Sequence, residues 1–426
     1  MMTTHAADIP ATSATSSATS SATSSATSAA LAGAPAGARH VLRLMNELPH
    51  GSLAVELPGG QQLCLGGRRQ PGLRASIRLH NWNVCAAALA SGDIGFAESF
   101  IAGDWSTPDL SALLRLFVTN RDTLEGLVYG RWWGRLLHRG RHLLNRNSRA
   151  GSRRNVHAHY DLGNAFYQLW LDGGMSYSSA WFNGDTGQPL EQAQLAKWQR
   201  ALAECRLPRG GRLLELGCGW GALAECAALA LEARVTGVTL STEQLAFARQ
   251  RLHEAGVAQQ VDLRLQDYRD VDDGPYDAIV SVEMFEAVGR AYWPQFFNLL
   301  QHQLKPGGHA CIQTITIRDD LFERYVGGSD FIQQYIFPGG LLPSRTAFRE
   351  QALKAGLEVV NELAFGGDYA ETLRRWRQRF TAREAAVREL GFDTRFLRIW
   401  SFYLAYCEAA FDAGNTDVVQ FTLRKP

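Results

Sequence analysis

The chain has 426 residues, of which 46% are hydrophobic, and its formal net charge is +1 at pH 7. This length predicts two or three domains with a large core, and the near-neutral balance favours no strongly charged partner. The sequence contains no uninterrupted apolar run of the roughly 20 residues that a membrane span requires. Its seven cysteines form no C-x-x-C pair, so neither a disulfide framework nor a metal site is expected, and a reducing cytoplasm is favoured.

Residues 1–37 are predicted to form a disordered tail. Residues 11–28 repeat Ala, Thr and Ser and contain no large apolar side chain, so they bury too little surface to offset the entropy of ordering. The tail has neither the apolar segment of a signal peptide nor the arginines of a transit peptide, since the first arginine is Arg39.

Residues 38–128 are expected to form a small α+β domain. Alternating segments at 53–57 and 62–65, separated by Pro-Gly-Gly, predict a hairpin, and residues 75–80 predict a further strand. A helix is predicted over 82–90, followed by a loop-rich stretch at 92–105. No catalytic constellation occurs here, which leaves a packing or dimerisation domain and a lipid-handling module as the two interpretations.

A basic bridge at 129–154 contains eight arginines interleaved with Trp132, Trp133 and leucines, and no acidic residue occurs between Glu125 and Asp161. Arginines and tryptophans in this arrangement suit an anionic membrane surface. A solvated helix or linker is the alternative. Nucleic acid is disfavoured because no nucleic-acid-binding motif accompanies the bridge.

The remaining chain, 155–426, is organised around residues 212–221, which read R-L-L-E-L-G-C-G-W-G. A buried strand there breaks into three glycines and then a helix at 222–231, as in nucleotide-type sites. Further strands are predicted at 234–240, 261–265, 277–282 and 310–317, with helices at 242–255 and 293–304 between them. Alternating strands and helices predict an α/β, doubly wound, Rossmann-like sheet.

In such a sheet, ligand residues lie at the carboxyl ends of the strands, here Gly217, Thr239, Asp267 and Glu286. The second strand ends in Thr-Leu-Ser, where a dinucleotide site would place an acid for the ribose. The order of elements instead looks like a class I S-adenosylmethionine-dependent methyltransferase. Ser241, with Gln244 three residues later, matches a capping box that opens the following helix.

Several motifs, in order from about residue 51 to the C-terminus, resemble the cyclopropane-fatty-acyl-phospholipid synthase and mycolic acid cyclopropane synthase family. The segments that carry the resemblance are S-F-I-A-G-D-W (99–105), H-A-H-Y-D-L-G-N-A-F-Y (157–167), M-S-Y-S-S-A-W-F (175–182), L-G-C-G-W-G-A (216–222), G-V-T-L-S-T-E-Q (237–244), Q-D-Y-R-D (266–270), V-S-V-E-M-F-E-A-V-G (280–289), Y-I-F-P-G-G-L-L-P-S (335–344), F-G-G-D-Y-A-E-T-L (365–373) and F-Y-L-A-Y-C-E-A-A-F (402–411).

The resemblance implies that S-adenosylmethionine is the cofactor. The residues assigned to it are Tyr177, Ser178, Glu215, Gly217, Gly219, Gly221, Thr239, Gln244, Asp267 and Tyr268. It also implies that the acceptor is a cis double bond in an unsaturated phospholipid acyl chain, which would yield a cyclopropane fatty acid. An alkene is a poor nucleophile, so the protein must align it with the methyl group and exclude water.

Methyl transfer to an alkene leaves a carbocation, which aromatic faces can stabilise. The candidate aromatic residues are Tyr160, Phe166, Tyr167, Trp181, Phe285 and Tyr369, for each of which core packing is the alternative. A base must then remove a proton from the new methyl group. In the family, this base is a bicarbonate held by a Cys, a Glu, a His, an Ile backbone and a Tyr.

Carried over by position, three of these ligands are Glu286, Ile315 and Tyr369, whereas Ser179 replaces the Cys and Gln313 replaces the His. Ser and Gln can still donate hydrogen bonds to an anion, but Gln cannot become a cation as His can. Bicarbonate binding and ring closure are therefore open, and a methyl- or methylene-branched acyl chain is the alternative product. Cys407 matches a position sometimes assigned as the active-site cysteine, with a buried helical Cys as the alternative.

Two other classes of function are alternatives. Small-amine N-methyltransferases resemble the catalytic domain but lack the N-terminal domain and the bridge. A lipid-binding protein without activity would be expected to have a degraded glycine turn, yet the turn is intact. The resemblance further implies a cytoplasmic protein, peripheral to the inner face of the membrane, and a homodimer.

Overall fold

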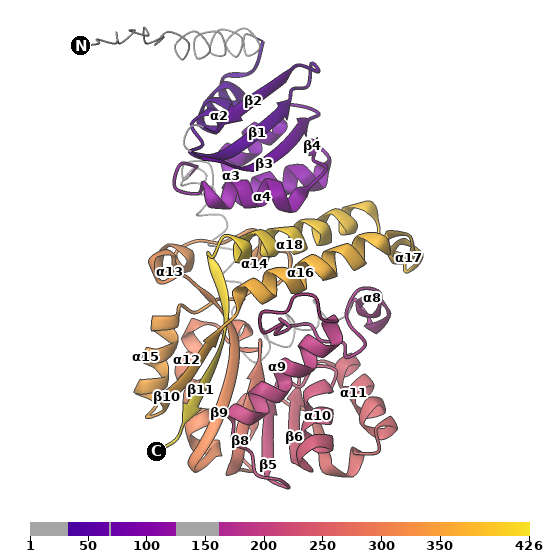
Figure 1. Ribbon diagram of the computed structural model, residues 1–426, viewed down its shortest axis with the longest axis vertical. Coiled ribbons are helices and arrows are strands. Elements are labelled where there is room, and N and C mark those ends of the chain that lie inside the picture. Colours follow the sequence, from indigo (N-terminus) through magenta and orange to yellow (C-terminus); the bar gives the residue numbers. More distant parts are fainter. Residues whose placement is uncertain (1–32, 68–69, 125–161) are drawn as a thin grey trace, which may run out of the picture.

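The computed structural model describes residues 33–67, 70–124 and 162–426 (Figure 1). The basic bridge at 129–154 and residues 1–32 of the predicted tail lie outside the described residues. The last residues of the predicted tail are not disordered, because helix α2 (Ala36–Asn46) already begins there and buries Ala38, Val41 and Leu42.

The N-terminal unit is a four-stranded sheet covered by helices. Its sheet order is β2-β1-β3-β4, with β1 and β2 antiparallel and β1 and β3 parallel. The hairpin predicted at 53–57 and 62–65 is confirmed by the pairing of β1 with β2. After α2, its elements are β1 (His50–Glu56), β2 (Gln62–Gly66), β3 (Gln70–Leu79), α3 (Asn83–Ala102), β4 (Trp105–Ser106) and α4 (Leu110–Thr119).

The prediction of a loop at 92–105 is wrong, because α3 continues to Ala102. The helix is kinked at Gly92, with φ 64° and ψ −133°, which explains why this glycine reads as a helix end in the sequence. In length and composition, α3 could cross a membrane. Its kink and its packing against α2, α14 (Phe331–Tyr335) and α18 (Thr394–Asp412) identify it as a core helix.

The larger unit contains a seven-stranded sheet in the order β10-β11-β9-β8-β5-β6-β7. Strand β11 runs antiparallel to both of its neighbours, whereas the five strands from β9 to β7 are parallel. This arrangement confirms the predicted doubly wound α/β fold. The strands are β5 (Arg212–Leu216), β6 (Arg234–Thr239), β7 (Val261–Leu265), β8 (Tyr276–Val282), β9 (Leu304–Ile317), β10 (Glu358–Ala364) and β11 (Thr416–Arg424).

The predicted helices of the sheet are also present. They are α10 (Ala222–Leu231), α11 (Thr242–Glu254) and α12 (Trp293–Gln303), preceded by α9 (Leu190–Glu204). Strand β9 starts at Leu304, earlier than the start predicted at residue 310, and so includes the sequence Lys-Pro-Gly-Gly at 305–308. The pairing of β9 with β8 shifts register over this stretch, and Gly307 donates its N–H to the carbonyl of Lys425. Pairing with the end of the chain therefore keeps these turn-forming residues in the strand.

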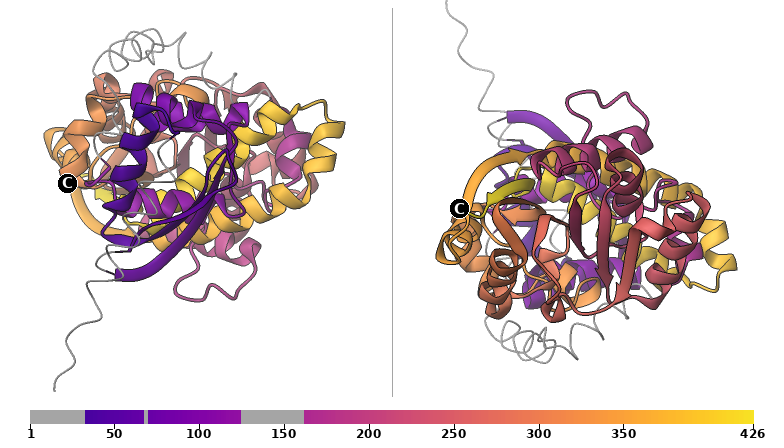
Figure 2. Two further views of the ribbon diagram at one scale, coloured as in Figure 1. Left: turned by 90° about the horizontal axis from the view of Figure 1, so that it is seen from above. Right: turned by 90° about the horizontal axis from the view of Figure 1, so that it is seen from below.

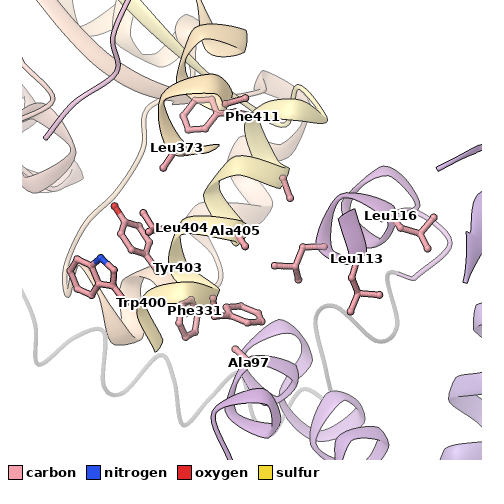
Figure 3. Packing of buried hydrophobic residues seen from close by; sticks show 14 of the residues in the cluster. Ala97, Leu113, Leu116, Phe331, Leu373, Trp400, Tyr403, Leu404, Ala405 and Phe411 are labelled. Atoms are coloured by element: carbon pink, nitrogen blue, oxygen red, sulfur yellow. The ribbon is translucent and has the colours of Figure 1, made fainter. Parts of the chain in front are cut away.

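Helices α16 (Gly366–Ala382) and α18 form a layer across one end of the large sheet, and the N-terminal unit packs on this layer (Figure 1). The views along the long axis show the N-terminal unit stacked over the larger unit (Figure 2). One hydrophobic cluster spans the interface, where Ala97 of α3 lies beside Phe331 of α14 and Leu113 of α4 lies on the side of α4 that faces α18 (Figure 3). The α16–α18 layer is therefore the common core between the two sheets.

Candidate active site

The glycine turn after β5 has the geometry of a ligand site. Gly219 has φ +51°, and a Cβ added there would meet no atom within 4 Å, so this glycine faces open space. Gly221 has φ +84°, and its added Cβ would lie 2.9 Å from the Cβ of Ala248 in α11. Gly221 thus allows α10 and α11 to pack closely, whereas Gly219 leaves room for a ligand to approach the backbone.

Glu215 lies in β5 directly before this turn, is buried, and has an Oε2 atom without a hydrogen-bond partner among the described residues. Burial raises the pKa of Glu215 to about 8. A buried carboxyl oxygen without a partner is costly, and a cationic group of a ligand would satisfy it. Together with the open space at Gly219, this fits bound S-adenosylmethionine, whose amino group is such a cation.

The cofactor residues predicted at the end of β6 and the start of α11 also lie at the carboxyl edge of the large sheet. Thr239 Oγ1 donates to Gln244 Oε1 at 3.0 Å, and Ser241 Oγ accepts the N–H of Gln244 at 3.2 Å. The N-cap predicted at Ser241 is confirmed. The second hydrogen bond of a capping box, from the N–H of Ser241 to the Gln244 side chain, is not formed, so that part of the prediction is wrong. The N–H of Ser241 donates instead to Thr239 Oγ1, so the Gln244 side chain is fixed against the strand end.

Asp267 follows β7 and forms a bidentate pair with Arg269, with 2.8 Å from Nε to Oδ1 and 2.5 Å from Nη2 to Oδ2. The neighbouring Tyr268 packs edge-on against Phe296, and its hydroxyl has no hydrogen-bond partner among the described residues. These two side chains complete a row at the ends of β5, β6 and β7, beside the switch in strand order between β5 and β8. Ligands bind at this place in open α/β sheets.

Tyr177 and Ser178 approach the site from the segment that precedes α9. The Tyr177 hydroxyl lies 2.7 Å from that of Tyr403 in α18. Ser178 Oγ accepts a 2.6 Å hydrogen bond from Lys197 Nζ, and Lys197 is fully buried in α9. Burial lowers the pKa of Lys197 to about 8, against the opposing charges of Glu283 and Asp172.

Glu283 occupies the centre of the group of residues that was predicted to hold bicarbonate. Its Oε1 accepts the N–H of Ser179 at 2.9 Å and the Gln313 amide at 2.7 Å, and its Oε2 accepts the Tyr369 hydroxyl at 2.6 Å. Its φ is 50°, a left-handed conformation that costs a non-glycine residue about 1 kcal/mol or more.

Glu286, the carboxylate predicted from the sequence, forms a separate group. Its Oε1 accepts the N–H of Ile315 at 2.5 Å and Thr314 Oγ1 at 2.9 Å, while its Oε2 has no partner among the described residues. Burial, and then the charge of Glu283, raise the pKa of Glu286 to about 8. Two neighbouring carboxyl groups do not both ionise easily, so Glu286 is the one that holds a proton near neutral pH.

This geometry does not fit a bicarbonate held by the five predicted positions. Ser179, Gln313 and Tyr369 already donate to Glu283, and Ile315 donates to Glu286. Ser179 Oγ donates to the carbonyl of Ala180, away from this group. The donors that an anion would need are therefore satisfied by the protein itself.

The other predicted residues fall into two groups. Phe285 is buried among Trp293, Phe296, Phe297 and Phe348, and Phe166 among Trp170, Phe380, Phe392, Phe396 and Trp400, so both are core residues. Tyr160 lies outside the described residues. Tyr167 contacts Tyr177 and Trp220, whereas Trp181 packs under the guanidinium of Arg200. Burial raises the pKa of Cys407 far above neutrality, which makes it a helical thiol rather than a reactive thiolate.

A doubly wound sheet with a glycine turn and a row of polar side chains at its switch point defines a class I methyltransferase. A solved coclaurine N-methyltransferase bound to N-methylheliamine and SAH has this fold, with a TM-score of 0.59 and 18% identity over 78% of this chain and 98% of that one. At this identity, only the fold is shared.

The family model of mycolic acid cyclopropane synthetase matches residues 147–421, and the chain belongs to that family. The tuberculostearic acid methyltransferase UfaA1 of Mycobacterium tuberculosis is 41% identical over 82% of this chain and 83% of its own length. The cyclopropane-fatty-acyl-phospholipid synthase of Escherichia coli is 35% identical over 81% of this chain and 87% of its own. The mycolic acid cyclopropane synthase CmaA1, solved with SAH and CTAB, is 33% identical with a TM-score of 0.60, over 64% of this chain and 98% of that one.

The protein is therefore a methyltransferase of the cyclopropane synthase family that acts on lipids, and S-adenosylmethionine is its cofactor. Sequence reasoning missed Glu283 and Lys197. Glu283 could have been found from its place directly after β8, by the same carboxyl-end rule that selected Glu286. Lys197 gave no such signal, because a lysine within a helix is usually exposed.

Proposed function

We propose that this protein transfers a methyl group to a carbon of a cis double bond in an unsaturated acyl chain of a phospholipid. The observation that carries this proposal is an apolar cavity of about 250 Å³ between the N-terminal unit and α18, whose wall also includes Ile317 at the end of β9. Its lining includes Leu53, Ile77 and Ala88 from the N-terminal unit and Phe402 from α18. An acyl chain is the lipid part that such a lining would take up.

A short chain of hydrogen bonds connects the cavity wall to the backbone of Glu286. Tyr325 and Leu342 line it, and the Tyr325 hydroxyl accepts the N–H of Leu342 at 3.2 Å. The adjacent Leu341 donates its N–H to the backbone carbonyl of Glu286 at 2.9 Å. A chain seated in the cavity would therefore pass the end of β9, the strand whose Ile315 donates its N–H to the Glu286 carboxyl group.

The residues at this place suit alkene methylation. S-adenosylmethionine supplies an electrophilic methyl group when bound, and the protein has to orient the double bond toward it and exclude water. The rings of Tyr177, Tyr369 and Trp376 form an aromatic wall, with 5.6 Å between the centroids of Tyr177 and Trp376 and 6.2 Å between those of Tyr369 and Trp376. Such faces stabilise the carbocation left by methyl transfer.

For the product, we propose a methylene-branched chain, or a methyl-branched chain where a separate hydride donor reduces the intermediate. Ring closure and methylene formation both require loss of a proton from the new methyl group, and ring closure requires that loss before a hydride shift moves the cation. The neutral Gln313 lacks the charge with which a cationic His would hold a bicarbonate base beside that methyl group. The relative named as a tuberculostearic acid methyltransferase supports this choice. A cyclopropane is the second candidate, favoured by the family model and by the Escherichia coli relative.

The lipid surface is also part of the proposal. The eight arginines and two tryptophans of the bridge at 129–154 favour a protein that is cytoplasmic and peripheral to an anionic membrane face. A homodimer remains a proposal that rests on the resemblance alone.

The test is incubation of the purified protein with S-adenosylmethionine and vesicles of phosphatidylglycerol that carry one cis double bond per acyl chain, followed by mass analysis. We expect acyl chains heavier by one CH2 unit. Proton NMR separates the products, because ring protons lie far upfield whereas a methylene branch gives vinyl signals. Absence of heavier chains, with S-adenosylhomocysteine still bound, would overturn the lipid acceptor.

A further inference from the structure

We propose that the Glu283 carboxylate is itself the base that removes the proton from the newly transferred methyl group, in place of a bound carbonate-type anion. This inference rests on the proposed function and deepens it, since it names the group that completes the reaction. It also predicts that the enzyme works without bicarbonate.

The first support is the surroundings of the carboxylate. Three donors from three separate segments converge on it: the backbone N–H of Ser179, the side-chain amide of Gln313 on β9 and the hydroxyl of Tyr369 on α16. Hydrogen bonds from donors favour the ionised form of a carboxyl group. Burial raises the pKa of Glu283, and the three hydrogen bonds and the positive charge of Lys197, buried in α9, oppose this rise.

The second support is the backbone of Glu283. A left-handed backbone conformation is uncommon for residues other than glycine, and it persists where the surrounding structure enforces it. A glycine at this position, directly after β8, would adopt the conformation without strain. The chain instead has a glutamate there, and its carboxylate accepts hydrogen bonds from three donors. Strain of this kind at a ligand site points to a function for the side chain.

The third support is the division of roles with Glu286. Both oxygens of Glu283 accept hydrogen bonds, whereas Glu286 has one oxygen without a partner among the described residues. Burial raises the pKa of both carboxyl groups, and the like charge of Glu283 raises that of Glu286 further, whereas hydrogen bonds from Tyr369, Ser179 and Gln313 lower that of Glu283. The proton of the pair therefore rests on Glu286, and Glu283 is the carboxyl group of the two that accepts a proton.

The step balances without any further reagent. A C–H bond of the new methyl group breaks, and its electron pair forms either the third bond of a ring or, after a hydride shift between the two former alkene carbons, a methylene double bond. The proton goes to Glu283 Oε2, which accepts only the Tyr369 hydroxyl whereas Oε1 accepts two donors. The proton then leaves to water when the product departs.

The first experiment compares Glu283→Gln with the wild type in the vesicle assay, in buffer freed of carbon dioxide. We expect wild-type turnover to be unchanged by removal of bicarbonate, and turnover of the variant to fall by about 100-fold or more, the usual range for loss of a general base. Affinity for S-adenosylhomocysteine should change little, because Gln fills the same space. An unchanged rate in Glu283→Gln, or a wild-type rate that collapses without bicarbonate, overturns the inference.

The second experiment uses Glu283→Gly, which relieves the left-handed strain and vacates the space between the three donors. We expect this variant to bind carbon-13-labelled bicarbonate, observed by NMR, and to regain activity as bicarbonate is added, whereas the wild type binds none. Glu232→Gly is the matched control, since Glu232 has φ 52° and lies on the surface beside Arg209. Bicarbonate binding by the wild type would contradict the inference even if no lipid product were found, which separates it from a failure of the proposed function.

Discussion

The Tyr369 hydroxyl donates a 2.6 Å hydrogen bond to Glu283 Oε2 and thereby joins α16 to the end of β8. The two residues are 86 positions apart in the sequence. The bond places the layer that carries the N-terminal unit in direct contact with the proposed base, so the helical layer and the chemistry of the sheet are linked.

We expect Tyr369→Phe to raise the pKa of Glu283, because one of the donors that favour its ionised form is lost. The acidic limb of the pH–rate profile should therefore move to higher pH, with a loss of about 10-fold in rate below neutrality. Tyr276→Phe is the control, since the Tyr276 hydroxyl donates to Asp273 before the start of β8. A profile that stays in place would contradict a role for Tyr369 in tuning the base.

Stability should fall as pH rises from about 5 to about 8, because the folded protein holds protons on Glu286 and Glu215 that the unfolded chain has lost. The sign follows because the folded-state pKa of each group is raised to about 8, above the ordinary value for a glutamate. Glu286→Gln should remove part of this slope, on the order of 1–3 kcal/mol over the interval. Urea denaturation at both pH values measures the change, and an equal slope in both proteins would refute it.

Binding of S-adenosylhomocysteine should release about one proton near neutral pH, because Glu215 is protonated when buried alone and ionises beside a cationic amino group. Calorimetry in two buffers with different heats of ionisation measures this release. In Glu215→Gln the release should vanish. As a control, Glu225→Gln changes a carboxylate of the same region that pairs with Arg251 and should leave the release intact.

Two substitutions in the glycine turn should affect cofactor binding and protein stability separately. Gly219→Ala has space for its Cβ and should fold with a loss of about 1 kcal/mol for its backbone conformation, yet bind S-adenosylhomocysteine at least 10-fold more weakly. Gly221→Ala meets Ala248 at 2.9 Å and should lower the melting temperature instead. If Gly219→Ala bound the ligand normally, the open space above this glycine would not be the cofactor site.

Filling the cavity should change the choice of acyl chain. Ala88 is a small residue in the cavity wall, so Ala88→Trp is expected to shift the preference toward shorter chains while leaving S-adenosylhomocysteine binding unchanged. Leu353→Trp, at an exposed position on α15 (Arg345–Lys354), is the control. Competition between vesicles of different chain length, read by mass, measures the preference, and an unchanged preference would rule out the cavity as the acyl site.

The amino-acid sequence alone predicts the five parallel strands of the large sheet and the glycine turn, but not the strands β10 and β11. Residues 212–231 and 261–265 were predicted to within a residue or so, because alternating apolar strands and capped helices are local signals. It also identified the family, since the motifs along the chain are specific in combination. It failed at α3, where small residues and Gly92 resemble a loop although tertiary packing holds a kinked helix.

Which glutamate carboxylate accepts the hydrogen bonds at the centre of the site is set by the tertiary structure. Position by position, the sequence assigns Glu286. The donors to Glu283, which are the backbone N–H of Ser179 and the side chains of Gln313 and Tyr369, belong to segments that meet only when the sheet, α16 and the loop before α9 are assembled. Hydrogen bonding depends on atoms within about 3 Å, and no local pattern encodes which of two glutamates, three residues apart, will face three donors. The folded chain places Glu283 there.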